Sequence, residues 1–240
     1  MNERNQLLFC TDERDSVANQ NSEIRKRFLT RTYLALCASV ASFVALSLGM
    51  TRLCGDLAIS FMRESHWFCF VGSIALIAAI CYARYQALTR LGGGRRGQLA
   101  MLAINVVGSA LFYLPYFAYA WSERRDVMFW ALGATASLFA ALTAAVFVTR
   151  IDFRPLGTWC VLALIAIMLG AVVAALTCAY VPTLLCGVAI LIASGFILAD
   201  TSTALHNCDR DMELTAADLL FSDCVWLYFN ILHWAEGWTE

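Results

Sequence analysis

Three aspartates lie inside stretches of sequence that are otherwise apolar. Asp200 belongs to GFILADTSTAL, and Asp218 and Asp223 belong to AADLLFSDCVWLY. A carboxylate at the centre of a membrane helix costs about 2.5–3.5 kcal/mol on insertion scales, so such residues usually face a partner or a water-filled path. Two carboxylates that meet in a medium of low dielectric constant do not both ionise, and they can share one proton. The chemistry available to these residues is proton sensing, or transient binding of Ca²⁺ by carboxylate oxygens.

The helices that carry the aspartates determine which of them can meet. If one helix ends near residue 205 and the next begins near residue 214, Asp200 lies about 8 Å from the helix end, Asp218 about 6 Å and Asp223 about 13 Å. Both helices meet the same side of the membrane, so Asp200 can reach either of the other two. Asp218 and Asp223 are about 140° apart around their helix and cannot both face one partner. The depths leave this choice open, and the shallow Asp218 also suits a helix cap or interfacial water.

The composition places these helices in a membrane. Of the 240 residues, 60% are hydrophobic and 15% are charged, against roughly 45–50% and 25% in soluble domains. The mean hydropathy is +0.67. These values exclude an ordinary soluble domain and a disordered chain. The net charge of −1 leaves no basic surplus for binding a nucleic-acid backbone.

Seven apolar segments follow a polar tail. We expect a flexible cytosolic tail over residues 1–26 and a single transmembrane domain over residues 27–236. The first six segments reach the ~20 residues that a helix needs to cross a bilayer, and the short alternating strands of a barrel are absent. The predicted fold is therefore an all-α integral membrane protein, a bundle of seven transmembrane helices. Its expected spans are 28–50, 66–88, 98–121, 127–149, 156–180, 182–205 and 214–234.

The distribution of basic residues predicts the orientation. Thirteen of the 17 Lys and Arg residues lie in the tail and in every second loop. By the positive-inside rule the N-terminus is cytosolic. A full seventh crossing would leave the C-terminus in the lumen or outside the cell, whereas a segment that dips in and returns would leave it in the cytosol.

Three further patterns favour structural roles. The stripe Ala136, Ala140 and Ala144 favours close packing inside the bundle over a dimer face. Most of the ten cysteines lie in apolar runs and are expected to act as small core residues, although Cys54 and Cys69 flank one loop and could pair in an oxidising lumen. No set of residues has metal-ligand spacing, and no cofactor is expected.

The loop before the last segment is acidic. Asp209, Asp211 and Glu213 alternate along it, but Leu214 and Leu220 stand where an EF-hand loop needs Gly and Glu. A solvated loop is the favoured interpretation, and a mouth that attracts cations is the alternative.

Four stretches, taken together and in order, resemble one known family. They resemble the opening of its first span, its fourth span with a charged exit, the Asp-Thr turn of its sixth span and the Ala-Ala…Asp pattern of its seventh. The stretches are RFLTRTY (27–33), TASLFAALTAAVFVTRIDF (135–153), FILADT (196–201) and AADLLFSD (216–223). Over residues 24–234 the chain resembles the Bax-inhibitor, or transmembrane Bax inhibitor motif, family.

This resemblance implies a fold, a function and a site. The implied fold is a seven-helix bundle with the last helix at its centre. The implied function is a leak of Ca²⁺, as permeant ion, from endoplasmic reticulum or Golgi stores, with protection from apoptosis. Asp200 and Asp223 would form the proton-sharing pair that gates the pore and transiently binds Ca²⁺, with Asp218 as a further candidate on the ion path. Arg84 is the nearest match to a basic latch of the pair, or else a plain anchor at the membrane boundary. The implied partners are the lipid bilayer, Ca²⁺ and host apoptosis-regulating proteins.

The chain also departs from the family pattern. Ala199, Ser202 and Cys224 stand where the family prefers other residues, and Asp218 stands where the family is usually apolar. Such departures are typical of a diverged member, for example a copy carried by a large DNA virus.

Two other classes of function remain as alternatives. One is a receptor-like seven-span protein, and the other is a membrane-anchored interaction protein without ion flux. The short cytosolic loops and the absence of an Asn-x-Ser/Thr sequon disfavour a receptor. No Ser/His/Asp set or His-rich set converges on one membrane depth, so we do not expect an enzyme.

Overall fold

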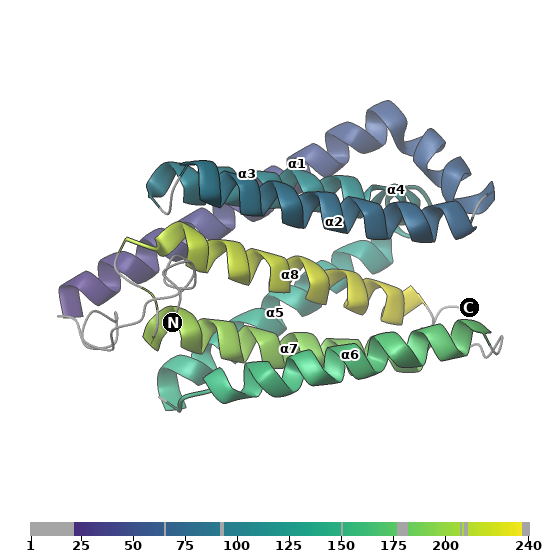
Figure 1. The fold of residues 1–240 in the computed structure, drawn as a ribbon. Helices are drawn as coiled ribbons and strands as arrows, with labels where there is room; N and C mark the ends of the chain where they lie inside the picture. Colours follow the sequence, from purple (N-terminus) through teal and green to yellow (C-terminus); the bar gives the residue numbers. More distant parts are fainter. Residues whose placement is uncertain are drawn as a thin grey trace. The chain divides into compact units, whose positions relative to one another are not determined.

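The described part of the chain is helical and contains no strand. The computed structural model describes residues 22–64, 66–91, 94–149, 151–176, 182–206, 208 and 211–236. Eight helices occupy these residues (Figure 1). They are α1 (Ser22–Glu64), α2 (His66–Leu91), α3 (Arg95–Phe112), α4 (Leu114–Glu123), α5 (Arg125–Thr149), α6 (Arg154–Leu176), α7 (Pro182–His206) and α8 (Glu213–Glu236).

The segment 98–121, predicted as one span, is two helices. The prediction of one continuous helix is therefore wrong, because α3 ends at Phe112 and α4 begins at Leu114, with a bend of 54° between them. Pro115 lies in the first turn of α4. Proline has no backbone N–H and fits the first turn of a helix, whereas inside a helix it removes a hydrogen bond and causes a kink or a break, so it favours the start of a new helix here.

The first helix also differs from its predicted span. It was expected over 28–50, but α1 runs from Ser22 to Glu64. The last five residues assigned to the tail, 22–26, are its first turns, and residues 1–21 lie outside the described part of the chain. The helix continues through Gly55. This glycine is buried, and a Cβ there would contact Thr51 and Ala118.

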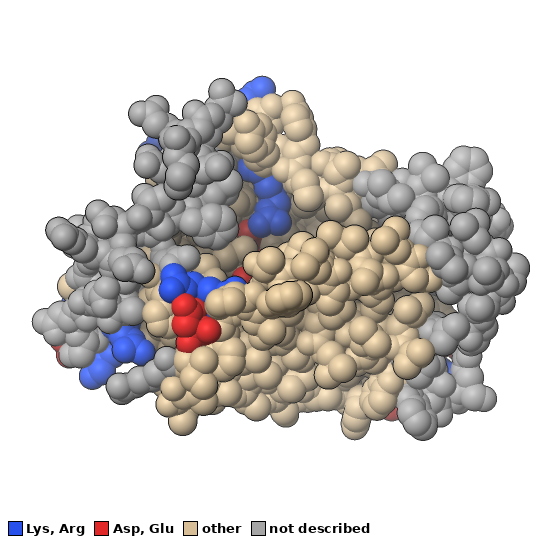
Figure 2. All heavy atoms as spheres, turned by 60° about the horizontal axis from the view of Figure 1, so that its bottom comes forward, with Lys and Arg blue, Asp and Glu red and all other residues tan. Residues whose placement is uncertain are grey.

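Several helices are long and apolar enough to cross a membrane. Among the described residues, three pass this test by length and composition, in α1, α5 and α7, and the bent pair of α3 and α4 makes a fourth if it is one broken span. The apolar part of α6, Arg154–Gly170, is shorter. Much of the face drawn in Figure 2 carries no charged side chain. The part of the chain that the structure describes is therefore all helical, with three to four candidate spans, and the count of seven stays a prediction.

The chain divides into two compact units. The first comprises Met1–Arg125 and Asn207–Phe221, and the second comprises Asp126–His206 and Ser222–Glu240. The first nine residues of α8 thus belong to the first unit and the rest to the second. The single transmembrane domain and the central position of the last helix stay predictions.

In the first unit, α1 packs against α3 and α4, and α2 packs against α3. The contact between α2 and α3 is close at Gly108, where an added Cβ would lie 2.6 Å from the Ile80 side chain. The rings of Phe43 on α1 and Phe221 on α8 meet edge to face at 6.0 Å. The ring contact attaches the first half of α8 to α1 within this unit.

In the second unit, α6 packs against α7 through small residues. A Cβ at Gly195 would collide with the sulfur of Cys160, and one at Gly157 would contact the methyl group of Ala199. Phe196 on α7 meets Trp226 on α8 edge to face at 6.1 Å. The close approach of α6 and α7 places the polar end of α7 next to α6.

Two structural expectations from the sequence have different outcomes. Ala136, Ala140 and Ala144 all lie on the exposed side of α5, so the expected internal packing of this stripe is not seen. The buried side chains of α5 include Thr135, Thr143 and Val146. Small apolar residues can also face lipid chains, so their spacing alone does not select a buried face.

The possible Cys54–Cys69 pairing is the second expectation. Cys54 is a free, exposed thiol, whereas the side chain of Cys69 lies outside the described part.

Candidate functional site

The last helix carries two aspartates in different surroundings. Asp218 lies in the part of α8 that belongs to the first unit, and Asp223 lies in the part that belongs to the second. The side chain of Asp218 is completely buried, and Asp223 is 8% exposed. The partners of each aspartate lie within its own unit, so the two aspartates form two separate sites.

Asp223 meets Asp200, which lies near the end of α7. The two carboxyl groups lie close enough to interact directly with each other. A hydrogen bond between two carboxyl groups requires a proton on one of them, because an ionised carboxylate only accepts. Oδ2 of Asp223 is buried, and no donor group among the described residues binds it. The arrangement is thus a carboxyl pair that can hold one proton between its two members.

Cys160 on α6 is the third side chain at this pair. Its thiol is buried and interacts electrostatically with both Asp200 and Asp223. Gly195 lets α7 approach the sulfur closely. The sequence predicted Cys160 to be a small core residue. The signal for its place beside the aspartates was Gly195, which lies five residues before Asp200 in α7 and lets the sulfur approach.

The pair is not a ready-made metal site. Within the described residues, no group of three or more His, Cys, Asp or Glu side chains could hold a metal ion. Ca²⁺ takes six to eight oxygen ligands, so two carboxylates would leave most of its ligands to water. Such a pair suits a passing ion better than a resident one.

Asp218 has a complete set of partners. Arg84 on α2 donates to Asp218 Oδ2 in an ion pair. Asn105 on α3 donates from Nδ2 to Oδ1 at 2.7 Å. One buried carboxylate therefore joins three helices, and each of its oxygens has its own donor. This arrangement neutralises the charge and holds the first half of α8 in place.

Two expectations about these residues differ from the structure. The shallow Asp218 was expected to suit a cap or interfacial water, but it is completely buried. Arg84 was expected as a latch on the Asp200–Asp223 pair or as a plain anchor, but it pairs with Asp218. Depth along a helix does not measure burial, because neighbouring helices cover shallow residues. Asn105 was missed, and its signal was an amide in the middle of an apolar segment.

The acidic loop is partly built into the structure. Glu213 is 8% exposed, and its Oε1 lies 3.6 Å from Arg31 on α1. Gln98 on α3 donates to the backbone carbonyl of Asp211 at 3.1 Å. Asp209 lies outside the described part. Asp211 is exposed, as a solvated loop predicts, whereas Glu213 is buried at the first residue of α8.

The connection between α5 and α6 is tied to α7 close to Asp200. Asp152 accepts hydrogen bonds from the Arg154 guanidinium at 2.7–2.9 Å, and Ser202 donates to it at 3.3 Å. The Ser202 hydroxyl also accepts from the backbone N–H of Phe153 at 3.1 Å. Hydrogen bonding from Arg154 holds the pKa of Asp152 well below its usual range. Ser202, noted above as a departure from the family pattern, lies two residues after Asp200 on α7. Its hydroxyl group thus ties the connection between α5 and α6 to α7.

Fold and site together define the class: a membrane protein whose described part is all helical and whose last two helices carry aspartates that meet inside otherwise apolar segments. The comparison with family models is specific. The model described as "Inhibitor of apoptosis-promoting Bax1" (Bax1-I) matches residues 25–236. The chain therefore belongs to this Bax inhibitor family, which confirms the resemblance recognised in the sequence.

Comparison with the curated proteins and with the solved structures gave no match. Membership of the family indicates an apoptosis-related membrane protein. A viral source stays a prediction.

Proposed function

We propose that this protein is a Ca²⁺-permeable, pH-sensitive leak channel of endoplasmic reticulum or Golgi membranes, with its N-terminus in the cytosol. It would lower the Ca²⁺ content of the store and so protect the cell from apoptosis. It uses no cofactor and is not an enzyme, and Ca²⁺ is its permeant ion. Membership of the Bax inhibitor family supports this proposal. The observation that carries it is the close approach of the Asp200 and Asp223 carboxyl groups, on two neighbouring helices that are otherwise mostly apolar.

The pair supplies a gate in this proposal. With one proton, the two carboxyl groups are bridged and hold α7 and α8 together at this level. When the proton leaves, two negative charges in a medium of low dielectric constant repel each other. The helices then separate locally, and the carboxylate oxygens become available to Ca²⁺. The flux is therefore expected to rise with pH.

Asp218 has a different part in this proposal. Its two oxygens are taken by Arg84 and Asn105, so it does not offer a free ligand to a passing cation. We assign it the positioning of the first half of α8, which leaves the gate to Asp223.

The test is Ca²⁺ entry into liposomes that contain the purified chain, measured between pH 6 and pH 8. We expect wild-type flux to rise with pH. Asp200→Asn and Asp223→Asn should both lose this rise, because an amide cannot acquire the negative charge that opens the pair. Asp126→Asn is the matched control, because Asp126 is an exposed acid in the first turn of α5.

Two outcomes would contradict the proposal. A wild-type pH dependence in both pair variants would remove the gate from these residues. The absence of flux at every pH, from folded protein, would remove the channel and favour a membrane-anchored interaction protein.

A further inference from the structure

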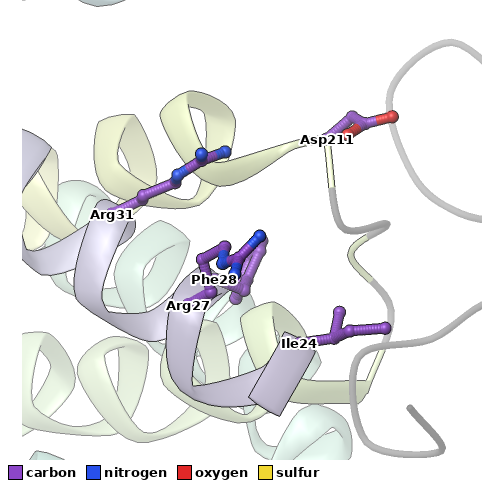
Figure 3. Close-up of a pocket in the computed structure, with 5 residues that line it drawn as sticks. All are labelled: Ile24, Arg27, Phe28, Arg31 and Asp211. Carbon is purple, nitrogen blue, oxygen red and sulfur yellow. The ribbon is translucent and has the colours of Figure 1, made fainter. Parts of the chain in front are cut away.

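A cavity lies at the beginning of α1, apart from the aspartates described above. Its volume is about 370 Å³, and Figure 3 shows the residues that line it. Four come from the first turns of α1 and one from the segment before α8, all within the first unit. They are Ile24, Arg27, Phe28, Arg31 and Asp211. The volume falls in the range of small-molecule sites, about 300–1,000 Å³.

The two arginines leave hydrogen-bond donors available to a ligand. Arg27 and Arg31 are four residues apart, so they lie on one face of the helix. None of the ion pairs among the described residues involves Arg27, which is exposed. Arg31 has one contact, at 3.6 Å to Glu213, and its side chain is 58% exposed. Each guanidinium carries five N–H donors in a planar fork that matches the oxygens of a phosphate group.

The sign of the charge favours an anionic ligand. The first ten residues of α1 contain four basic residues against Glu23 alone: Arg25, Lys26, Arg27 and Arg31. Asp211 is the acid among the lining residues, and in Figure 3 its side chain points away from the two arginines. The guanidinium groups are therefore the polar groups that a ligand in this cavity would meet first.

The position of the cavity favours a lipid over a soluble anion. No charged residue follows Arg31 until Arg52, and the candidate span of α1 runs through this apolar stretch. The cavity thus lies at one end of the apolar part of α1, at the level where a bilayer has its headgroup phosphates. Phe28 is 3% exposed, and with Ile24 it gives the cavity an apolar side suited to the glycerol and upper acyl region of a lipid.

We infer that this cavity binds the phosphate group of an anionic phospholipid, with the guanidinium groups of Arg27 and Arg31 donating hydrogen bonds to the phosphate oxygens. The site would anchor the first turns of α1 to the cytosolic leaflet. This inference does not depend on ion flux or on the Asp200–Asp223 pair.

The test is phospholipid binding by the purified full-length chain in detergent, read by native mass spectrometry. The probes are phosphatidylglycerol, phosphatidylcholine and inorganic phosphate. We expect phosphatidylglycerol to bind in preference to phosphatidylcholine. Arg27→Gln should weaken this binding about fivefold, and Arg27→Gln combined with Arg31→Gln should weaken it by more than tenfold. Arg52→Gln, which removes the same charge beyond the other end of the apolar stretch, should leave it unchanged.

Thermal unfolding of each variant separates loss of binding from loss of folding. Arg31→Gln also removes the contact with Glu213, so if the double variant does not fold, Arg27→Gln and Arg27→Lys decide the question. Arg27→Lys should retain more binding than Arg27→Gln because it keeps the charge.

Three outcomes would overturn the inference. The first is equal binding of phosphatidylglycerol by wild type and Arg27→Gln, and the second is equal binding of the two lipids by wild type. The third is stabilisation by inorganic phosphate without binding of anionic lipid, which would assign the cavity to a soluble anion.

Discussion

The same helix, α8, holds two aspartates that differ in what surrounds them. Asp218 is held by a guanidinium and an amide, so its charge is balanced and both of its oxygens accept hydrogen bonds. Asp223 lies against another carboxyl group, and no donor group among the described residues binds its buried Oδ2. A buried carboxylate with a complete set of donors stabilises one geometry, whereas a buried pair of carboxyl groups has a geometry that depends on its proton. Residue type alone does not separate these two roles, and the neighbouring helices do.

The largest expected effect is on the Asp218 cluster. Replacing Arg84 by Ala leaves Asp218 buried without its counter-ion, which should lower the free energy of unfolding by about 3–5 kcal/mol. Arg84→Met combined with Asp218→Leu should recover most of this loss, because no buried charge remains. Thermal unfolding in detergent measures both. If Arg84→Ala were as stable as wild type, the pair would not hold α2 and α8 together.

At the Asp200–Asp223 pair, a substitution is expected to increase the stability of the protein and not to lower it. Asp223→Asn should raise the free energy of unfolding at pH 8 by about 1–4 kcal/mol, because it removes the repulsion between two negative charges. At pH 6 the change should be smaller, since the pair then holds a proton. Unfolding of wild type and variant at the two pH values gives this comparison. A loss of stability at pH 8 would show that Asp223, like Asp218, is a structural carboxylate.

An intermediate effect is expected at Asn105. Asn105→Ala removes the neutral donor to Asp218 and leaves Arg84 in place. The loss of a hydrogen bond to a charged group should cost about 1.5–3 kcal/mol. The same unfolding measurement applies, and the higher helix propensity of Ala than of Asn offsets at most about 0.7 kcal/mol of the loss. An Asn105→Ala variant as stable as wild type would mean that Arg84 alone satisfies Asp218.

The smallest expected effect is at Asp152, which lies between α5 and α6 and contacts Ser202 on α7. Because Arg154 lowers the pKa of Asp152 in the folded protein, the ionised carboxylate stabilises the fold above its usual pKa of about 4. This contribution is lost as the pH falls below that value. The group is partly exposed, so the effect should be under about 1 kcal/mol. As the pH is lowered from 6 to 3, stability should fall more steeply for wild type than for Asp152→Asn, and parallel curves would contradict the prediction.

Much of the architecture could be predicted from the sequence. Length and hydropathy depend on the chain alone, so the positions of the helices and the candidate aspartates follow from them. The pattern at 196–201 and 216–223 was also specific enough to indicate the Bax inhibitor family, which the family model confirms. The bend at Tyr113 was missed, although Pro115 was a local signal for it.

The partner of each polar side chain was decided by the tertiary structure. Asp200 could reach either aspartate of the last helix by depth, and only the packing of α7 against that helix pairs it with Asp223. Arg84 is separated from Asp218 by 134 residues, and Asn105 by 113. Contacts over such separations depend on how several helices rotate and pack, which no local pattern encodes. The sequence by itself determined that this is a helical membrane protein of the Bax inhibitor family with carboxylates inside the apolar segments of its last helices. Only the folded chain determined which carboxylate is neutralised by an arginine and which lies against another carboxyl group, because that depends on side chains brought in from other helices.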